Sequence, residues 1–302
     1  MTDTVVYPIP DHFSEAHVTP ERYHTLYRQS LDDPDTFWSE QAQLLDWHSP
    51  WSAVSETNVT KGAARWFVDA KLNVSVNCID RHLPERAHDT AIIWEGDDPD
   101  DSQSFTYQEL KIQVCRFANA LRAQGIGKGD RVCIYMPMIP EAAFAMLACA
   151  RIGAIHSVVF GGFSPEALKD RINDATCSMV ITADEGVRGG KTVPLKRNVD
   201  AALAQVDCVD SVIVVRRTGC ETDWVDGRDV WYHDATAAIS DDCEPEWMDS
   251  EDPLFILYTS GSTGKPKGVL HTTGGYLLQA AMSMKYVFDY RDGETYLSLI
   301  HI

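Results

Sequence analysis

Apolar runs of strand length, separated by helical segments, fill the chain from about residue 90 onward and constrain its fold more than any other feature. The runs cover residues 132–136, 156–160, 178–182, 212–215 and 254–257. Their apolar residues stand at nearly consecutive positions, as is typical of strands buried on both faces. Because helical segments separate the runs, we expect an α/β fold with a doubly wound, mostly parallel sheet and helices on both faces.

Several of these helices carry clear start and stop signals. The pattern Thr106-Tyr-Gln-Glu109 is a capping box, and Gly125 is placed to end the helix that it opens. A second helix is expected from Pro140 to Ile152, and a third after the N-cap residue Ser164, which Pro165 follows. Further helices are expected over residues 196–205 and 275–287.

The first part of the chain is different, because it is rich in aromatic residues and lacks a clean periodicity. We expect residues 1–85 to form an irregular N-terminal extension packed on the main body, and residues 86–302 to form the main α/β domain. Two acidic stretches of that domain, residues 95–101 and 241–252, are expected to be solvated surface loops.

Charge and composition exclude several classes of partner. Lys and Arg number 26 against 45 Asp and Glu, and the net charge of −19 repels nucleic acid and anionic lipid. The N-terminus lacks a signal-peptide pattern and the longest apolar run is too short to span a bilayer, so a cytoplasmic protein without nucleic-acid or membrane partners is expected. The eight scattered cysteines are expected to be reduced, buried thiols, and the ten histidines show no metal-ligand spacing.

One loop, Tyr258-Thr-Ser-Gly-Ser-Thr-Gly-Lys-Pro-Lys-Gly-Val269, has the chemistry of a polyphosphate site. It is not a P-loop, because Thr259 replaces the first glycine of that motif and Pro266 follows the lysine where Ser or Thr is required. It does not contain the G-x-S-x-G elbow of serine hydrolases either. Its hydroxyls, two lysines and glycine amides still offer many donors and positive charge to phosphate oxygens.

A second candidate site is Arg188-Gly-Gly-Lys191. Its glycines allow close backbone approach, and its flanking Arg and Lys can grip a phosphate. Taken alone, this string is more typical of a solvated turn. Phe160 and Phe163 enclose another glycine pair after a strand and are either part of a ligand site or core residues. For Met136, Met138, Cys149 and His156 we expect core packing.

The phosphate loop resembles the signature of the adenylate-forming, AMP-binding acyl-CoA synthetases. Longer segments of the chain, residues 72–83, 130–138, 149–164 and 183–196, resemble acetyl-CoA synthetases (acetate–CoA ligases) within that family. The resemblance covers roughly residues 20–296. It departs at Asp69-Ala70-Lys71, where the family usually has a glycine pair, and again after Tyr296, where residues 297–302 match nothing in the family.

The resemblance implies a two-step reaction in which acetate and ATP give acetyl-adenylate and diphosphate, and CoA then displaces AMP. The implied substrates are acetate, ATP with magnesium, and CoA, with the magnesium ligands, the acyl pocket and a mobile C-terminal domain outside this chain. Lys267 is the implied catalytic residue. The implied ATP phosphate contacts are Thr259, Ser260, Gly261, Ser262, Thr263, Gly264, Lys265 and Lys267, and the implied CoA contacts are Arg188, Gly189, Gly190 and Lys191.

Two alternatives to an acetate–CoA ligase stay open at this point. A propionate–CoA ligase or another short-chain acyl-CoA synthetase would carry similar motifs. A truncated, inactive remnant is also consistent with the sequence, because the chain stops after Ile302 without the second half that the family implies.

Overall fold

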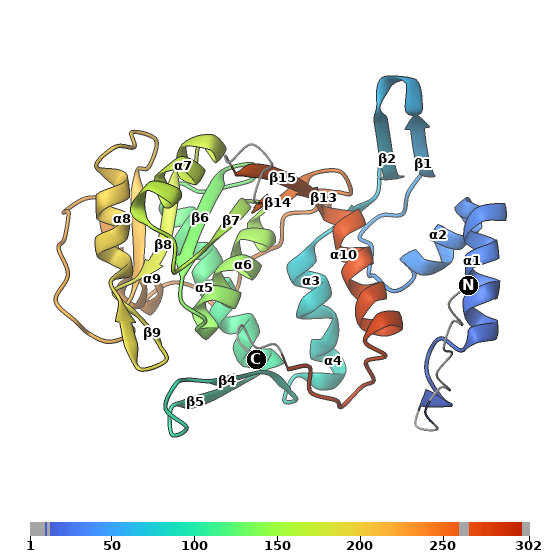
Figure 1. The fold of residues 1–302 in the computed structure, drawn as a ribbon, viewed down its shortest axis with the longest axis horizontal. Coiled ribbons are helices and arrows are strands. Elements are labelled where there is room, and N and C mark those ends of the chain that lie inside the picture. Colours follow the sequence, from blue (N-terminus) through green and yellow to red (C-terminus); the bar gives the residue numbers. More distant parts are fainter. Residues whose placement is uncertain (1–9, 11–12, 260–265, 298–302) are drawn as a thin grey trace, which may run out of the picture.

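The computed structural model describes residues 10, 13–259 and 266–297, and its centre is a sheet of seven strands in the order β12-β11-β8-β6-β7-β14-β15. All neighbouring strands are parallel except β14 and β15, which are antiparallel (Figure 1). The mostly parallel sheet expected from the sequence is therefore confirmed. Its strands are β6 (Arg131–Met136), β7 (Ile155–Phe160), β8 (Met179–Ala183), β11 (Ser211–Val215), β12 (Asp229–Trp231), β14 (Pro253–Thr259) and β15 (Lys267–Thr272).

Helices cover both faces of this sheet because the chain reverses its direction of travel. It moves from β6 to β7 through α6 and then back through α7 to β8 and through α8 to β11. Right-handed crossovers place α7 and α8 on the face opposite α6, and α5 and α9 pack on the α6 side. The helices are α5 (Tyr107–Ala123), α6 (Pro140–Ile152), α7 (Pro165–Ala175), α8 (Leu195–Leu203) and α9 (Tyr232–Ala237).

The predicted helix signals have the expected geometry. Thr106 and Glu109 form the capping box of α5, with both reciprocal hydrogen bonds present. The side chain of Ser164 accepts a hydrogen bond from the backbone of Ala167 and so caps α7. Gly153 ends α6 with φ of 73°, a left-handed conformation that favours glycine. The buried faces of these helices and the strands form one core around side chains such as Tyr135 and Phe117.

The N-terminal extension forms short elements and packs on the C-terminal part of the chain. A second hydrophobic cluster, separate from the core around the central sheet, joins Phe67 and Leu72 of the extension to Leu277 and Leu278 of α10. Helix α10 lies beside the extension in Figure 1. The elements of the extension are α1 (Pro20–Asp32), α2 (Pro34–Ala42), β1 (Ala53–Asn58), β2 (Ala63–Val68), β3 (Lys71–Leu72), α3 (Val74–Cys78) and α4 (Leu83–Arg86), with 3-10 turns at Val59–Lys61 and Asp80–His82, and α10 of the C-terminal part covers Thr273–Met282.

Several short strands were not predicted from the sequence. Among the described residues, four two-stranded antiparallel sheets pair β1 with β2, β4 (Thr90–Glu95) with β5 (Ser102–Thr106), β9 (Gly186–Arg188) with β10 (Lys191–Val193), and β3 with β13 (Met248–Asp249). β15 stands between the phosphate loop and α10, which begins at Thr273 and continues as a π-helical segment over Ser283–Val287.

Some burial predictions were wrong. Met138 is 65% exposed, because it follows the end of β6, whereas Met136, Cys149 and His156 are buried as expected. Phe160 and Phe163 are each 40% exposed and are not core residues. No disulfide occurs in the described part of the chain, but Cys78 is exposed and Cys208 and Cys220 are only partly buried. Among the described residues, no helix combines the length and apolar character needed to cross a bilayer.

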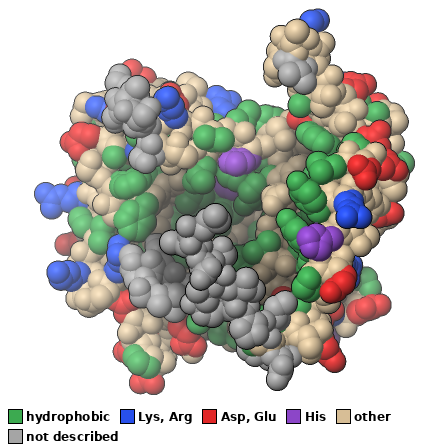
Figure 2. Space-filling model, turned by 45° about the vertical axis from the view of Figure 1, so that its right-hand side comes forward, with side chains coloured by type: hydrophobic (Ala, Val, Ile, Leu, Met, Phe, Trp, Pro, Cys, Tyr) green, Lys and Arg blue, Asp and Glu red, His purple; other side chains and the backbone are tan. Residues whose placement is uncertain are grey.

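Apolar surface is exposed at one end of the sheet. Leu257 on β14 and Val269 and Leu270 on β15 are 42–52% exposed, and Val158 on β7 is 38% exposed. In the space-filling view hydrophobic side chains gather around a hollow in the molecule, with acidic side chains toward the margin (Figure 2).

Candidate functional site

The segments singled out in the sequence follow the carboxyl ends of three parallel strands of the central sheet. The β9–β10 hairpin follows β8, the turn from Phe160 to Phe163 follows β7, and the phosphate loop follows β14. Parallel strands end at the same edge of a sheet, and that edge is where doubly wound folds bind their ligands. The topology therefore gathers the candidate segments along one edge.

The string Arg188-Gly-Gly-Lys191 is the tip of the β9–β10 hairpin. Gly189 and Gly190 have φ of 58° and 71°, and both positive values are what a two-residue type I′ turn requires. The register pairs Arg188 directly with Lys191, and both residues are exposed. The turn thus presents two cationic side chains side by side, and the backbone N–H of Gly190 donates to Asp97 Oδ2 at 3.1 Å.

Phe160 comes from a different strand but meets this hairpin. The guanidinium carbon of Arg188 lies 5.4 Å from the centroid of the Phe160 ring, which is a cation–π contact. Phe163 packs edge-on against Phe160 with centroids 5.7 Å apart. The structure therefore brings together a planar cation and a half-exposed aromatic face, which suit a phosphate and an adenine ring respectively.

Tyr135 supports the turn between the two phenylalanines from inside the core. Its hydroxyl lies 2.7 Å from the carbonyl oxygen of Phe163 and 3.1 Å from that of Gly161, and it accepts a hydrogen bond from Asn198 Nδ2 at 3.1 Å. Burial raises the pKa of Tyr135, so the hydroxyl stays protonated and able to donate. Sequence reasoning missed this residue, because a tyrosine within an apolar strand looks like ordinary core.

The phosphate loop connects the two antiparallel strands at the far side of the sheet. Thr259 and Lys267 are paired across β14 and β15 at the base of this loop, and both side chains are exposed. The other predicted phosphate contacts lie outside the described residues: Ser260, Gly261, Ser262, Thr263, Gly264 and Lys265. The structure therefore places only the two ends of the phosphate loop, Thr259 and Lys267, and both lie at the same edge of the sheet as the β9–β10 hairpin.

Arg171 of α7 links the two candidate sites. Its guanidinium carbon lies 4.6 Å from the Phe163 ring centroid and 5.5 Å from that of Tyr258, the residue before Thr259. Tyr258 is fixed further by a hydrogen bond from its hydroxyl to Asp174 Oδ2 at 2.6 Å. A row of guanidinium and aromatic groups in contact thus runs along the edge from Arg188 through Phe160, Phe163 and Arg171 to Tyr258.

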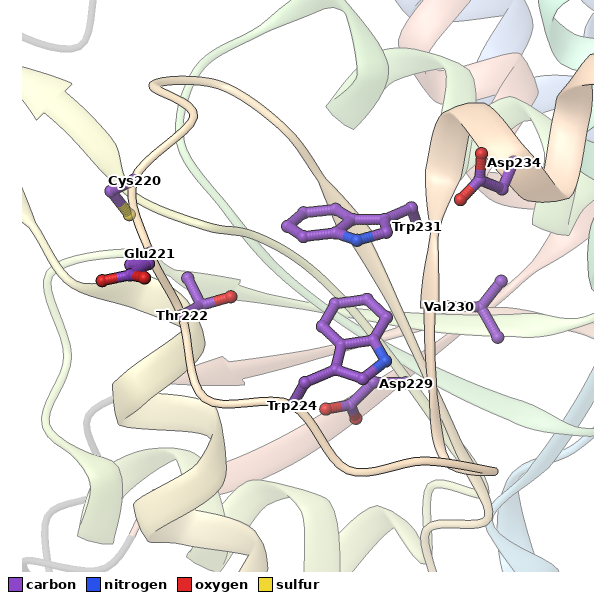
Figure 3. A pocket seen from close by; sticks show the side chains of 8 residues that line it. All are labelled: Cys220, Glu221, Thr222, Trp224, Asp229, Val230, Trp231 and Asp234. Atoms are coloured by element: carbon purple, nitrogen blue, oxygen red, sulfur yellow. The ribbon is translucent and has the colours of Figure 1, made fainter.

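A groove of about 490 Å³ lies elsewhere, around the loop before β12 (Figure 3). Its wall contains Trp224 and Trp231, which stack with centroids 4.6 Å apart. Arg216 lies over the Trp231 ring at 4.6 Å, and the Asp229 carboxylate is already paired with Lys196 and Arg228. Because these groups satisfy one another, we interpret this groove as a packed surface feature and not as the active site.

Metal-ligating side chains do not cluster within the described residues: no group of three or more His, Cys, Asp or Glu is arranged to hold an ion there.

Comparison with known proteins identifies the family. The profile of the AMP-binding enzyme family matches residues 79–302, and the profile of the acetyl-coenzyme A synthetase N-terminus matches residues 23–78. The chain is 70% identical over 281 residues to acetyl-coenzyme A synthetase 2 of Pseudomonas putida, covering 93% of this chain and 44% of that protein. It is 63% identical over 298 residues to acetyl-coenzyme A synthetase of Saccharophagus degradans, covering 98% of this chain and 46% of that protein.

A solved structure supports the same conclusion. Acetoacetyl-CoA synthetase from Streptomyces lividans superposes with a TM-score of 0.82 at 29% identity, over 92% of this chain and 43% of that chain. The chain thus spans less than half the length of these relatives. With a family profile that matches most of its residues, the chain belongs to the AMP-binding enzyme family.

Proposed function

We propose that this chain supplies the ATP-phosphate loop and the CoA-binding hairpin of an acetate–CoA ligase. In the proposed reaction a carboxylate oxygen of acetate attacks the α-phosphorus of ATP and expels diphosphate, which gives acetyl-adenylate. The thiol of CoA then attacks the acetyl carbon, loses its proton and expels AMP, which gives acetyl-CoA. Relatives that match nearly the whole chain at 63–70% identity are named acetyl-coenzyme A synthetases, which favours acetate as the substrate.

The observation that carries the proposal is the contact between Arg188 and Phe160. A CoA nucleotide needs a flat apolar surface for its adenine and cations for its phosphates, and this contact offers both at one place. Lys191 lies beside Arg188 in the hairpin register and adds a second cation. In a chain with net charge −19, such a local gathering of positive charge favours a polyanionic ligand.

For the first step we propose that Lys267 stabilises charge on the departing diphosphate. Its pairing with Thr259 fixes it at the base of the loop, so that both ends of the loop start from the sheet edge. Phosphoryl chemistry of this kind needs little covalent help, and positioning together with charge stabilisation supplies most of the acceleration. Ser260, Gly261, Ser262, Thr263, Gly264 and Lys265 complete the proposed phosphate contacts.

We further propose a division into an extension over residues 1–85 and an adenylate-forming domain over residues 86–302. The proposed partners are small molecules, namely acetate, ATP with magnesium, and CoA, without nucleic acid or membrane. The proposed location is the cytoplasm. The net charge of −19 supports the exclusion of nucleic acid and of anionic lipid surfaces.

The test is a chimera in which residues 1–296 of this chain replace the matching part of the 70%-identical Pseudomonas putida protein. The chimera is supplied with ATP, CoA and either acetate or propionate, and the nucleotide and acyl-CoA products are separated by chromatography. We expect acetyl-CoA, AMP and diphosphate in equal amounts, with a higher kcat/KM for acetate than for propionate.

The parent protein is the control for the assay, and its thermal unfolding temperature is the control for the fold of the chimera. If the products were ADP and phosphate, the proposed ligase reaction would be wrong and the chain would belong to an enzyme with another ATP-dependent activity. A faster reaction with propionate would overturn acetate as the preferred substrate, and a folded but inactive chimera would favour the inactive remnant.

A further inference from the structure

Asp184 lies at the root of the β9–β10 hairpin, directly after β8, and its carboxylate is buried with 1% of the residue exposed. One carboxylate oxygen, Oδ1, accepts hydrogen bonds from the backbone N–H groups of Glu185 at 2.7 Å and Arg217 at 2.8 Å. The other, Oδ2, accepts from the N–H of Gly219 at 2.7 Å, and the N–H of Thr218 is shared between both oxygens at 3.2 and 3.3 Å. Four backbone amides thus converge on one buried carboxylate.

The backbone of Asp184 ties the hairpin root to its surroundings as well. Its N–H donates to the carbonyl of Val215 at the end of β11, and its carbonyl accepts from the N–H of Lys196 in α8 at 3.2 Å. Residues 184 and 196 therefore close the base of the segment that carries the hairpin. Lys196 is fully buried, and its ammonium donates to Asp200 and to the carbonyl of Asp223.

The backbone amides that Asp184 binds at residues 217–219 belong to a turn after β11, and this turn is also connected to the tip of the hairpin. Arg217 bonds through its guanidinium to Asp101 Oδ2 at 2.5 Å and lies over the Trp94 ring. Asp101 and Asp97 belong to the same loop between β4 and β5, and Asp97 accepts the hydrogen bond from Gly190 at the tip. Asp184 thus holds the hairpin at its root. The β4–β5 loop holds it at its tip, and the turn at residues 217–219 anchors that loop through Arg217.

We propose that Asp184 is a positioning residue for CoA, which sets the hairpin so that Arg188 and Lys191 meet the nucleotide phosphates. This inference rests on the proposed function. In the proposed arrangement the carboxylate of Asp184 does not touch CoA. It acts only through the turn at residues 217–219 and the hairpin, so its loss should weaken CoA binding without slowing adenylation.

The test is Asp184→Asn in the chimera described above. The amide keeps the shape of the carboxylate but replaces one acceptor oxygen with an NH2 group, which faces N–H donors and repels them. We expect the KM for CoA to rise about tenfold, which corresponds to the loss of about one charge-assisted hydrogen bond. The kcat at saturating CoA and the acetate-dependent ATP–diphosphate exchange should stay within about twofold of the unmodified chimera.

The matched control is Asp252→Asn, at the amino end of β14 and so at the opposite end of the sheet. Asp252 also accepts a backbone N–H, from Asp249 at 2.8 Å, and pairs with Lys128. Its substitution should leave the KM for CoA unchanged even where it lowers the unfolding temperature. An equal rise in the KM for CoA in both variants would make the effect of Asp184→Asn one of general destabilisation and would overturn the inference.

Arg188→Ala separates the inference from the proposed function. If neither Arg188→Ala nor Asp184→Asn changes the KM for CoA, the hairpin is not a CoA site and the proposed function fails at that point. If Arg188→Ala raises it and Asp184→Asn does not, only the positioning role is overturned. If Asp184→Asn does not fold, hydrogen exchange in the unmodified chimera decides: the amides of Thr218 and Gly219 should be strongly protected, and unprotected exchange would contradict the role given to Asp184.

Discussion

Arg188→Ala is the perturbation whose size follows most directly from the geometry of the site. The guanidinium stands over Phe160, and its loss removes the planar cation proposed to meet a CoA phosphate. A hydrogen bond to a charged group contributes about 1.5–3 kcal/mol, so the KM for CoA should rise roughly ten- to a hundredfold. Arg188→Lys keeps the charge but loses the fork geometry, so its KM for CoA should lie between that of the unmodified chimera and that of Arg188→Ala.

The assay measures two half-reactions on one preparation of the chimera. Acetate-dependent ATP–diphosphate exchange reports adenylation alone, and acetyl-CoA formation at varied CoA reports the whole cycle. The exchange rate should stay nearly intact in Arg188→Ala, because CoA takes no part in the first step. An unchanged KM for CoA, or a loss of exchange equal to the loss of turnover, would refute the assignment of the hairpin to CoA.

Three further predictions concern neighbouring and buried residues. Phe160→Ala should raise the KM for CoA roughly five- to a hundredfold with little change in exchange, since stacking of one base contributes about 1–3 kcal/mol; an unchanged KM would mean that adenine lies elsewhere. Burial lowers the pKa of His156 to about 4 from 6.5, so its neutral form stabilises the fold fully above pH 6.5 and this contribution falls as the pH drops toward 4. Urea unfolding at pH 7 and at pH 5 measures how much the free energy of unfolding falls between the two pH values. That fall should be about 2 kcal/mol smaller in His156→Gln than in the unmodified chimera, and an equal fall in both would contradict this. Asp80→Asn leaves the buried Arg151 guanidinium without its charged partner and should lower the free energy of unfolding by roughly 3–5 kcal/mol in the same measurement, whereas a loss near zero would show that the pair is dispensable.

The central sheet was predictable because its signals are local. The runs of apolar residues and the caps at Thr106 and Ser164 determine their elements without help from distant parts of the chain. The boundaries of α6, from Pro140 to Ile152, match the prediction for the same reason, since a proline begins it and Gly153 ends it.

The short hairpins were not predictable in this way. β9 and β10 contain three residues each, which is too short for a periodic pattern, and only the two glycines between them indicated a turn. β15 follows a loop rich in glycine and is exposed along much of its length, so neither periodicity nor burial distinguishes it from coil. Its pairing with β14 depends on the fold as a whole.

The acidic stretch over residues 241–252 shows how tertiary contacts override composition. It was expected to be a solvated loop, but Cys243, Met248 and Ser250 in it are buried. The carbonyl of Cys243 accepts a hydrogen bond from the Arg151 side chain at 2.6 Å, and β13 pairs with β3 of the extension. These partners lie about 90 to 180 residues away in sequence, and no local pattern reveals them.

The candidate site was predictable as a set of segments but not as an arrangement. The strings around Arg188, Phe160 and Lys267 stood out through their glycines and charges, whereas the contact between Arg188 and Phe160 depends on the order of β8, β6 and β7 in the sheet. Asp184 and Tyr135 carried one weak signal, since each is a polar residue in or directly after an apolar strand, near the edge where doubly wound folds bind their ligands.

Lys267→Ala in the chimera tests most directly whether the chain holds one loop for adenylation and a separate hairpin for CoA. The acetate-dependent ATP–diphosphate exchange rate should fall roughly ten- to a thousandfold, as for the loss of one electrostatic stabiliser. Transfer of the acetyl group from supplied acetyl-adenylate to CoA should change by less than about threefold. Equal losses in the two half-reactions, or an unchanged exchange rate, would contradict the assignment of the loop at Lys267 to the adenylation step.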